Sequence, residues 1–262
     1  NNRGTPATAK TVGGQAMVVN NFEILNINCA DGPCTFSGIN DTTLATLNVT
    51  GNSAVSLGQV DAAGSTINSI SASTLIGSFS ATINDLATGA NITTGFGDDA
   101  LTIGGGSDAL TAFVFLGAGN DTFIGDPNTS CNDTVSGGAG NDTIQAGRGI
   151  NLITTGPGVD TIVYAQAFAP HRSDITDFSP GVGGDVLQFS RGALGLANGG
   201  AAISGSTDVD TGAFNNLKNN VDVFLVTGIA FASDAAMEQK VADDDDAAGA
   251  LVILYFNSTD KS

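Results

Sequence analysis

The sequence predicts an all-β protein whose centre is a right-handed parallel β-roll, a flattened solenoid in which each coil of chain lies on the one before. Two observations predict this fold. A nine-residue pattern occurs seven times between residues 94 and 163, and its eighth place is apolar in every copy. Glycine supplies 36 of the 262 residues while tryptophan is absent, so the chain is rich in turn-forming residues and poor in large core side chains.

The seven copies share one register. They read TGFGDDALT from Thr94, IGGGSDALT from Ile103, LGAGNDTFI from Leu116, NTSCNDTVS from Asn128, GGAGNDTIQ from Gly137, AGRGINLIT from Ala146 and TGPGVDTIV from Thr155. Except in the copy from Asn128, the second and fourth places are glycine: Gly95, Gly97, Gly104, Gly106, Gly117, Gly119, Gly138, Gly140, Gly147, Gly149, Gly156 and Gly158. The sixth place holds Asp99, Asp108, Asp121, Asp133, Asp142, Asn151 and Asp160. The eighth holds Leu101, Leu110, Phe123, Val135, Ile144, Ile153 and Ile162.

Each place has a physical reason. Glycine accepts a positive φ without steric cost, so the first six residues of the pattern, which contain two glycines, can turn the chain sharply. The last residues form a short strand whose middle side chain points to one face, and that face is apolar. One turn and one strand make half a coil, so two copies complete a coil and their aliphatic side chains fill a narrow interior.

Loops one coil apart are expected to lie over one another. If AFVF (112–115) and GDP (125–127) are insertions, the predicted stacked pairs are Asp99 with Asp121, Asp108 with Asp133, Asp121 with Asp142, Asp133 with Asn151, and Asp142 with Asp160. Stacked carboxylates repel one another unless a cation lies between them. Hard oxygen ligands from flexible loops favour Ca²⁺ over Mg²⁺ or a transition metal. The alternative is a glycine-rich solenoid that binds no metal.

The pattern G-G-x-G-x-D-x-U-x, with U apolar, resembles the RTX, or haemolysin-type calcium-binding, repeat. The resemblance covers residues 94–163 and implies several bound Ca²⁺ ions. It also implies that carbonyls from places one and three of one loop, and from places two and four of the next, complete each site beside the sixth-place side chains. The copy from Asn128 departs from the pattern, because Thr129 and Cys131 replace both glycines, and this puts its site in doubt. Cys131 is interpreted as a small loop residue rather than a reactive thiol.

Charge and composition narrow the choice of partners. A net charge of −18 argues against nucleic acid and against an anionic membrane. Aspartate makes up 24 of the 26 acidic residues, which keeps the carboxylates close to backbone turns, a geometry suited to cation ligands. No apolar run is long enough for a membrane-spanning helix. Disorder is the alternative for an acidic, glycine-rich chain, and the regular Leu, Ile, Val and Phe content argues against it.

Cys29 and Cys34 bracket the tight-turn sequence ADGP. This arrangement predicts a disulfide across a short loop, as suits an oxidising compartment. A zinc site is the alternative, but the chain offers only one histidine and one further cysteine as additional ligands of that kind.

The residues before the repeats, 1–91, are predicted to form β-solenoid coils without calcium loops. Short alternating runs such as Leu47 with Val49, and Val55 with Leu57, are separated by turn-like sequences. The segment STINSISASTLIGSFSATI resembles the coils that lead into RTX repeats in bacterial surface-layer and related secreted proteins. The competing interpretation is an ordinary β-sandwich.

The remaining domains are a calcium-binding RTX roll at 92–180 and a small mixed α/β cap at 181–262. The segment HRSDITDFSPGVGGDVLQFS resembles the end of RTX rolls in type I secreted proteins. This resemblance implies a last ion at Asp174 and Asp177, with Asp185 as a further candidate.

Within the cap, the pattern predicts strands at 185–190, 222–228 and 250–256 and a short helix from Ser233 to Val241. A cap of this kind would cover the last open strand of the solenoid. The run DDDD at 243–246 is interpreted as a solvated loop, with a peripheral calcium site as the alternative.

Catalysis is not expected. The only histidine, His171, is interpreted as a loop residue at the exit of the roll, and no H-E-x-x-H motif or basic cluster accompanies it. A carbohydrate-binding module would need exposed aromatic residues, which two tyrosines do not supply.

The resemblance instead implies an extracellular structural protein of a bacterial cell surface, an S-layer or similar coat. Such a protein is exported by type I secretion and self-associates in a lattice, and any surface polysaccharide anchor lies outside this chain. Calcium binding between the stacked turns would drive its folding and assembly. The alternative is an RTX accessory or stabilising module of a type I secreted enzyme or adhesin.

Overall fold

The computed structural model describes residues 17–18, 22–61, 67–84, 86–104, 111–126, 131–165, 171–179, 183–189, 209–212, 223–231 and 252–257. The chain divides into two compact units, Asn1–Val163 with Phe168–Leu187, and Tyr164–Ala167 with Gln188–Ser262. Every regular element among the described residues is a β-strand. In the same residues we find no helix with the length and apolar character needed to cross a membrane.

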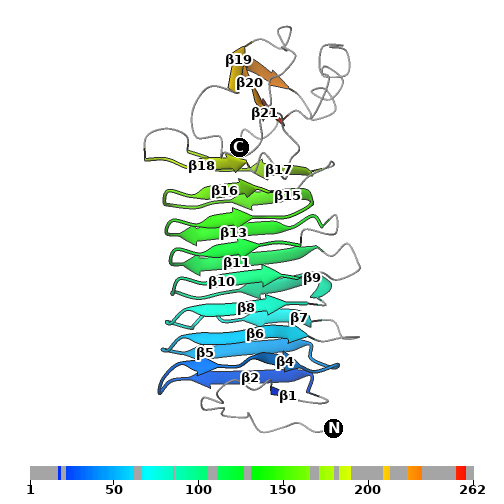
Figure 1. Ribbon diagram of the computed structural model, residues 1–262, viewed down its shortest axis with the longest axis vertical. Helices are drawn as coiled ribbons and strands as arrows, with labels where there is room; N and C mark the ends of the chain where they lie inside the picture. Colours follow the sequence, from blue (N-terminus) through cyan, green and yellow to red (C-terminus); the bar gives the residue numbers. More distant parts are fainter. Residues whose placement is uncertain are drawn as a thin grey trace. The chain divides into compact units, whose positions relative to one another are not determined.

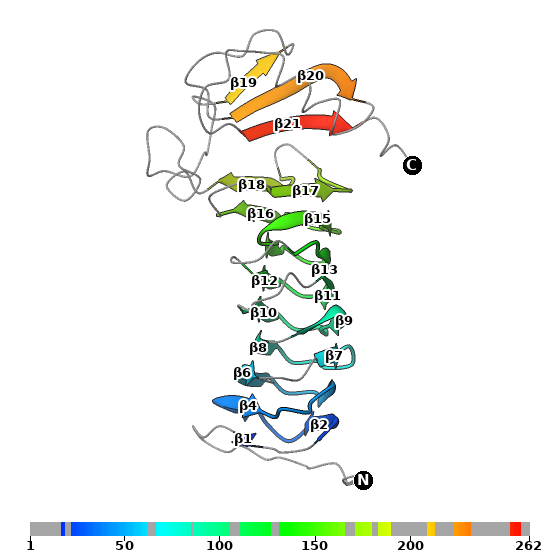
Figure 2. The same cartoon turned by 90° about the vertical axis from the view of Figure 1, so that its right-hand side faces the viewer.

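The first unit is a parallel β-solenoid made of two sheets, so the predicted all-β solenoid fold is confirmed (Figure 1). Sheet A contains β1 (Met17–Val18), β4 (Gly38–Asn40), β6 (Val55–Asp61), β8 (Phe79–Ile83), β10 (Ala100–Ile103), β12 (Thr122–Ile124), β14 (Thr143–Gln145), β16 (Thr161–Tyr164) and β18 (Val186–Phe189) in that order, with β3 (Cys34–Thr35) also paired to β6. Sheet B contains β2 (Ile24–Cys29), β5 (Thr46–Gly51), β7 (Ile67–Ser71), β9 (Leu86–Thr93), β11 (Ala112–Ala118), β13 (Thr134–Ala139), β15 (Gly149–Thr154) and β17 (His171–Ile175). Figure 2 shows the two sheets on opposite sides of the stack, with β8 and β10 in one and β7 and β9 in the other.

The interior is filled by the apolar residues that the repeat predicts. In sheet A, register partners stack Leu101, Phe123, Ile144 and Ile162 in one column. In sheet B, the corresponding column is Val114, Val135, Ile153 and Ile175. All of these side chains except Ile175 are buried. Each buried aliphatic side chain stabilises the fold by roughly 1.5–3 kcal/mol, so these two columns are a main source of cohesion between coils.

The region before the repeats continues the same two sheets. Leu25, Leu47, Ile70 and Ile92 are successive register partners in β2, β5, β7 and β9, all in parallel. The β-sandwich interpretation is therefore wrong, because a sandwich is built from antiparallel sheets. Strand β9 crosses the predicted boundary at residue 91, and the division of the chain into three domains stays a prediction.

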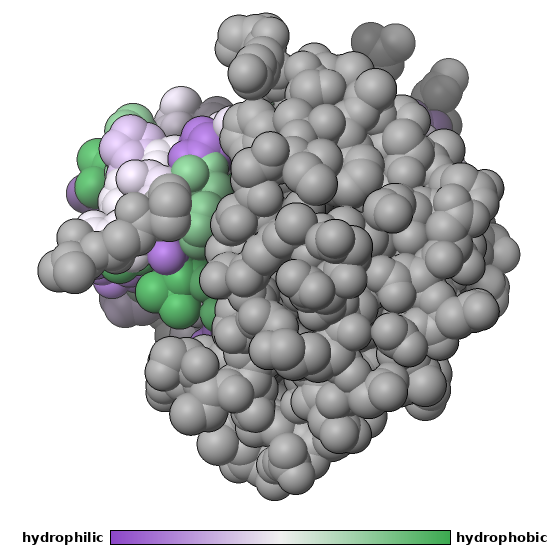
Figure 3. All heavy atoms as spheres, turned by 90° about the horizontal axis from the view of Figure 1, so that it is seen from above, coloured by the Kyte–Doolittle hydropathy of each residue, from purple (hydrophilic) through white to green (hydrophobic). Residues whose placement is uncertain are grey.

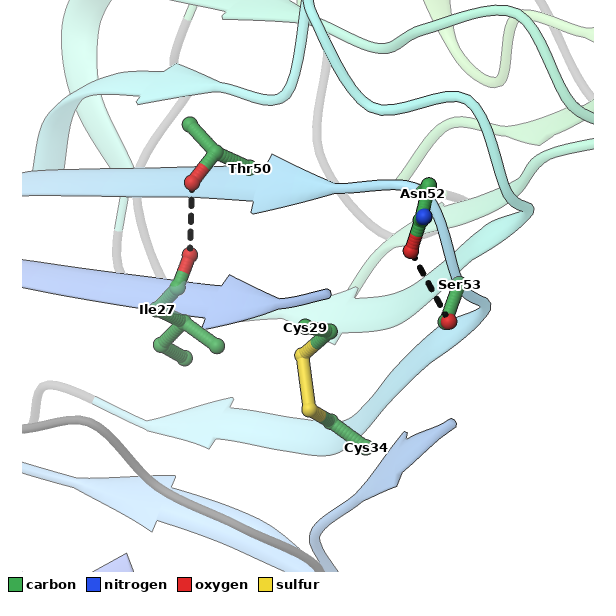
Figure 4. The surroundings of a disulfide bond; sticks show 6 residues. All are labelled: Ile27, Cys29, Cys34, Thr50, Asn52 and Ser53. Atoms are coloured by element: carbon green, nitrogen blue, oxygen red, sulfur yellow. Dashed lines mark hydrogen bonds between the residues drawn. A yellow bond between two sulfur atoms is a disulfide. The ribbon is translucent and has the colours of Figure 1, made fainter. Parts of the chain in front are cut away.

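A disulfide joins Cys29, the last residue of β2, to Cys34 in β3, with 5.9 Å between their Cα atoms (Figure 4). Both cysteines are buried. Beside them, Thr50 Oγ1 donates to the carbonyl oxygen of Ile27 at 3.4 Å. The bond closes a short loop near the start of the described solenoid.

The outer faces of the sheets mix polar and apolar residues, and Figure 3 shows both kinds on the described surface. Phe113 and Phe115 in β11 are 39% and 44% exposed, and Leu152 in β15 is 43% exposed. Exposed aromatic side chains are therefore present on this surface. They are phenylalanines, so the low number of tyrosines did not predict them.

The second unit contains a parallel sheet of β19 (Val209–Gly212), β20 (Val223–Phe231) and β21 (Val252–Asn257). β20 and β21 overlap the strands predicted at 222–228 and 250–256, and β18 overlaps the one predicted at 185–190. The predicted helix from Ser233 to Val241 and the DDDD run at 243–246 lie outside the described residues. His171 begins strand β17, so its interpretation as a loop residue is wrong.

Candidate metal centre

The loops of the solenoid lie at two edges. The loops that lead from sheet B to sheet A form what we call the first edge. In the repeat region these are the loops β9–β10, β11–β12, β13–β14, β15–β16 and β17–β18. The second edge is the set that leads from sheet A to sheet B. Because strands one coil apart are in register, equivalent loop residues lie over one another at each edge.

Five carboxylates form a continuous column along the first edge. Each backbone N–H donates to Oδ1 of the aspartate one coil further on: Asp99 to Asp121 at 2.7 Å, Asp121 to Asp142 at 2.8 Å, Asp142 to Asp160 at 2.8 Å, and Asp160 to Asp185 at 3.0 Å. All five side chains are buried. We call these residues the aspartate column.

The column confirms the predicted stacking of the aspartates at the first edge. The stacking of Asp133 with Asn151 is also confirmed, because Asp133 N–H donates to Asn151 Oδ1 at 2.9 Å. The prediction that AFVF (112–115) is an insertion is wrong, because this segment belongs to β11. Asp133 Oδ1 accepts from Ala112 N–H at 2.8 Å, and Phe113 is in register with Thr134, so Ala112 takes the place in the stack that was predicted for Asp108. Gly106 and Asp108 themselves lie outside the described residues.

One oxygen of the column is left without a donor in three successive coils. Oδ2 of Asp121, Asp142 and Asp160 is buried and accepts no hydrogen bond. Burial, with a smaller contribution from the neighbouring carboxylates, raises the pKa of Asp121 to about 7 and that of Asp142 to about 6. Burial also raises the pKa of Asp99 and of Asp160. An unpartnered buried carboxylate is costly, so this arrangement requires a positive charge or a proton.

A glycine leaves room for such a charge. A Cβ atom placed on Gly137 would collide with both Oδ2 of Asp142 and the carbonyl oxygen of Thr155, which belongs to the next loop. Two oxygens from successive loops therefore face the same small space. That space stays open because residue 137 has no side chain.

Close stacking of the loops brings further carbonyls to this edge. Gly138 and Gly140 have φ values of 107° and 136°, which favour glycine. A side chain at either would overlap the carbonyl oxygen of Gly117 or Gly119 in the preceding loop. The two coils therefore meet backbone to backbone, and carbonyl groups line the gap between them.

The donors fit Ca²⁺ better than a transition metal. Among the described residues no three His, Cys, Asp or Glu side chains gather around one point. A cation in a gap of the column would be held by a carboxylate oxygen together with backbone carbonyls, which is a hard, all-oxygen set. Calcium accepts such irregular oxygen sites, whereas Mg²⁺ demands near-ideal octahedral geometry.

Comparison with known proteins agrees with this chemistry. A family model for the RTX calcium-binding nonapeptide repeat, which describes four copies, matches residues 132–164. The chain carries RTX calcium-binding repeats. The matched range includes the loops of Asp142 and Asp160, and the cofactor of these repeats is Ca²⁺. The comparisons found no match to a curated protein and none to a solved structure.

The structure places the predicted ligands of the RTX repeats at both edges. The loops of the first edge contain Gly95, Gly97, Asp99, Gly119, Asp121, Gly140, Asp142, Gly156, Gly158 and Asp160, while Gly117 and Gly138 lie in the last residues of β11 and β13, which lead into these loops. The loops of the second edge contain Gly104, Asp133 and Gly147, while Gly149 and Asn151 lie in the first residues of β15. The role of these residues as calcium ligands stays a prediction.

The second edge differs in charge from the first. Its column runs through Ala112, Asp133 and Asn151, of which only Asp133 is charged. Burial raises the pKa of Asp133 to about 7, and the charge of Asp126 adds to this shift. Cys131, at 5% exposure, is a buried loop residue here. Negative charge is therefore concentrated at the first edge.

The last ion predicted at Asp174 and Asp177 stays a prediction, and neither residue belongs to the aspartate column. Asp174 lies within β17 opposite Leu152. Asp177 holds the preceding loop, accepting from Thr155 N–H and Gly156 N–H at 2.8 Å each. The residue that continues the column is Asp185, whose Oδ2 accepts from Ser179 N–H at 2.8 Å.

The sequence contains a signal for the place of Asp185 in the column. PGVGGDVLQ from Pro180 fits the RTX register, with glycine at places two and four, Asp185 at place six and Leu187 at place eight. The fifth place of the RTX repeat also has a structural role that the repeat pattern did not predict. Its side chains make regular hydrogen bonds between coils, as described below.

Proposed function

We propose that this chain is a secreted, calcium-dependent structural protein of a bacterial cell surface, an S-layer or a similar coat. The observation that carries the calcium part of this proposal is the aspartate column, with three buried oxygens that lack donors. Bound Ca²⁺ would supply the positive charge that these oxygens need. The gap beside Gly137, where Asp142 and the Thr155 carbonyl converge, is the best-defined place for it.

Folding would then depend on calcium. Without a cation, the carboxylates of neighbouring coils are buried close to one another and raise each other's pKa, which destabilises the stacked loops. Extracellular calcium modules have dissociation constants on the order of 10⁻⁴–10⁻³ M. Millimolar calcium outside a cell would therefore occupy the sites, and each occupied site adds to the free energy of unfolding.

The coat assignment is supported by the surface of the roll and by the resemblance of its early coils to those of surface-layer proteins. In β8, β10, β12, β14 and β16 no residue is charged. The carboxylates near these strands lie in the loops. Two copies of this acidic chain can therefore pack with these strands face to face without bringing negative charges against each other.

Titration of calcium tests the calcium part directly. Protein freed of metal is titrated with Ca²⁺ while far-ultraviolet circular dichroism is recorded, and Mg²⁺ at equal concentration serves as the control. We expect a gain of β-structure with a midpoint of roughly 0.1–1 mM for Ca²⁺ and little response to Mg²⁺. A spectrum that stays constant through millimolar Ca²⁺ would contradict the proposal.

A separate test addresses the coat. A coat protein should be a major surface protein of its cell and should be released by washing with EGTA. If the chain is found only as part of a scarce, larger secreted enzyme or adhesin, it is an accessory module and the coat assignment is wrong.

A further inference from the structure

A second set of hydrogen bonds runs along the first edge, outside the aspartate column. It is formed by the fifth-place side chains of the repeats. Asn120 N–H donates to Asp98 Oδ1 at 2.7 Å, Asn141 N–H donates to Asn120 Oδ1 at 2.8 Å, and Val159 N–H donates to Asn141 Oδ1 at 2.8 Å. We call Asp98, Asn120 and Asn141 the outer ladder.

The outer ladder and the aspartate column run in opposite senses. In the gap between β11–β12 and β13–β14, Asp142 accepts from the earlier coil, at Asp121 N–H. In the same gap Asn120 accepts from the later coil, at Asn141 N–H. Each of the three gaps between the β9–β10 loop and the β15–β16 loop therefore has one bond in each direction, made by adjacent residues of the same loop.

The second edge repeats this arrangement. Asn132 Oδ1 accepts from Ile150 N–H of the next coil at 2.8 Å, while Asn151 Oδ1 accepts from Asp133 N–H of the earlier coil. The crossed pair of bonds is thus a general device of these coils. It does not depend on the charge of the sixth-place residue.

We infer that the outer ladder couples neighbouring calcium sites, with Asp98, Asn120 and Asn141 as positioning residues. This inference rests on the calcium binding proposed above. Asn120 is held to the earlier coil through its own N–H and to the later coil through its side chain. The next residue, Asp121, lies in the column. A cation that fixes the column in one gap therefore also fixes the loop whose carbonyls face the adjacent gap.

The outer ladder ends at the β15–β16 loop. Val159 occupies the fifth place of the β15–β16 loop and has no acceptor atom, and its side chain is 40% exposed. The last gap, towards Asp185, therefore keeps its column bond but has no ladder bond from Val159. The fifth-place residue of the following loop is Gly184.

Loss of the ladder is tested with Asn120→Ala and Asn141→Ala. The control is Asn48→Ala, which removes an exposed bond between coils outside the repeats, where Asn48 Nδ2 donates to Asn26 Oδ1 at 2.8 Å. Calcium titrations followed by circular dichroism give a midpoint and a Hill slope. Loss of stability alone shifts the midpoint, whereas loss of coupling between sites lowers the slope. We expect a lower slope for the two ladder variants and an unchanged slope for Asn48→Ala. Equal slopes in all three variants and the unmodified protein would overturn the inference.

Extension of the ladder gives an independent test that does not remove any bond. Val159→Asn places an acceptor opposite the Gly184 amide, and Val159→Ala is its control. We expect a steeper titration for Val159→Asn only, and this pair decides the question if an Asn→Ala variant fails to fold in saturating calcium. A slope equal to that of Val159→Ala would overturn the inference. An unmodified protein without any calcium response would instead remove the proposed function.

Discussion

Gly138 and Gly89 both have a positive φ, 107° and 79°, but their surroundings differ. A Cβ on Gly138 would overlap the carbonyl oxygen of Gly117, whereas a Cβ on Gly89 would have no neighbour within 4 Å. A substitution at Gly89 therefore measures backbone strain alone, whereas the same substitution at Gly138 measures backbone strain together with the clash between coils.

We predict that Gly138→Ala destabilises the roll much more than Gly89→Ala. A left-handed backbone costs an alanine roughly 1–2 kcal/mol at either position. At Gly138 the coils must also separate, which should bring the total loss to at least about 3 kcal/mol. Urea unfolding in saturating calcium measures both free energies. Equal losses for the two variants would show that the contact between loops contributes nothing.

Residue positions in the column were largely predictable, and the exceptions have a physical cause. Asp142 and Asp160 were found because their spacing equals one coil with no insertion. The partner of Asp133 was predicted wrongly because strand pairing, here Phe113 with Thr134, sets the register, and a count in steps of nine residues does not detect this pairing. Asp185 was placed last among the candidates because the coil from Asp160 is 25 residues long, which hides the repeat.

At the level of elements, the aspartate column is a stack of neighbouring buried acids. The pKa of Asp121 is raised to about 7 and that of Asp142 to about 6, in both cases mainly by burial. A carboxyl whose pKa is higher in the folded state than in the unfolded state stabilises the fold below the unfolded value, near 4. That stability is lost as the pH rises through the folded value.

We therefore predict that the metal-free protein becomes less stable as the pH rises from about 4 to about 7. Melting temperatures of protein freed of metal by a chelating resin, measured across this range, test the prediction. In saturating calcium the fall should be absent, because a bound cation favours the charged carboxylates. A metal-free melting temperature that rises with pH would contradict it.

Strand type was easier to predict than strand pairing. Alternation of apolar residues at 47–57 indicated short strands, but it is equally consistent with a sandwich and a solenoid. The choice depends on long-range pairing, such as Leu25 with Leu47 and Leu47 with Ile70, which no local pattern encodes.

Across the whole first unit, the coils differ in how their buried acids are satisfied. Asp41, in an early coil, is buried and accepts from Phe22 N–H at 3.0 Å and from Thr43 N–H at 2.8 Å. Asp142 and Asp160, in the repeats, each keep a buried oxygen without a donor. Because each coil of a solenoid contacts only its neighbours, its parts can differ in stability.

We predict that removal of calcium unfolds the repeats before the early coils. Hydrogen exchange of the chelated protein, followed by mass spectrometry, should show loss of protection at 131–163 and retained protection at 24–61. Equal loss in both ranges would mean that the unit unfolds as one cooperative block and that the early coils have no independent stability.

The distance along the chain between successive members of the column varies, with 22 residues from Asp99 to Asp121, 21 from Asp121 to Asp142, 18 from Asp142 to Asp160 and 25 from Asp160 to Asp185. All four intervals nevertheless advance the stack by one strand spacing, about 4.8 Å. The extra residues of the longer intervals fall between paired strands in the sequence, and the strand register is kept on both sides of them. The solenoid can therefore lengthen only by duplication of complete layers, while its corners are free to acquire insertions of any size.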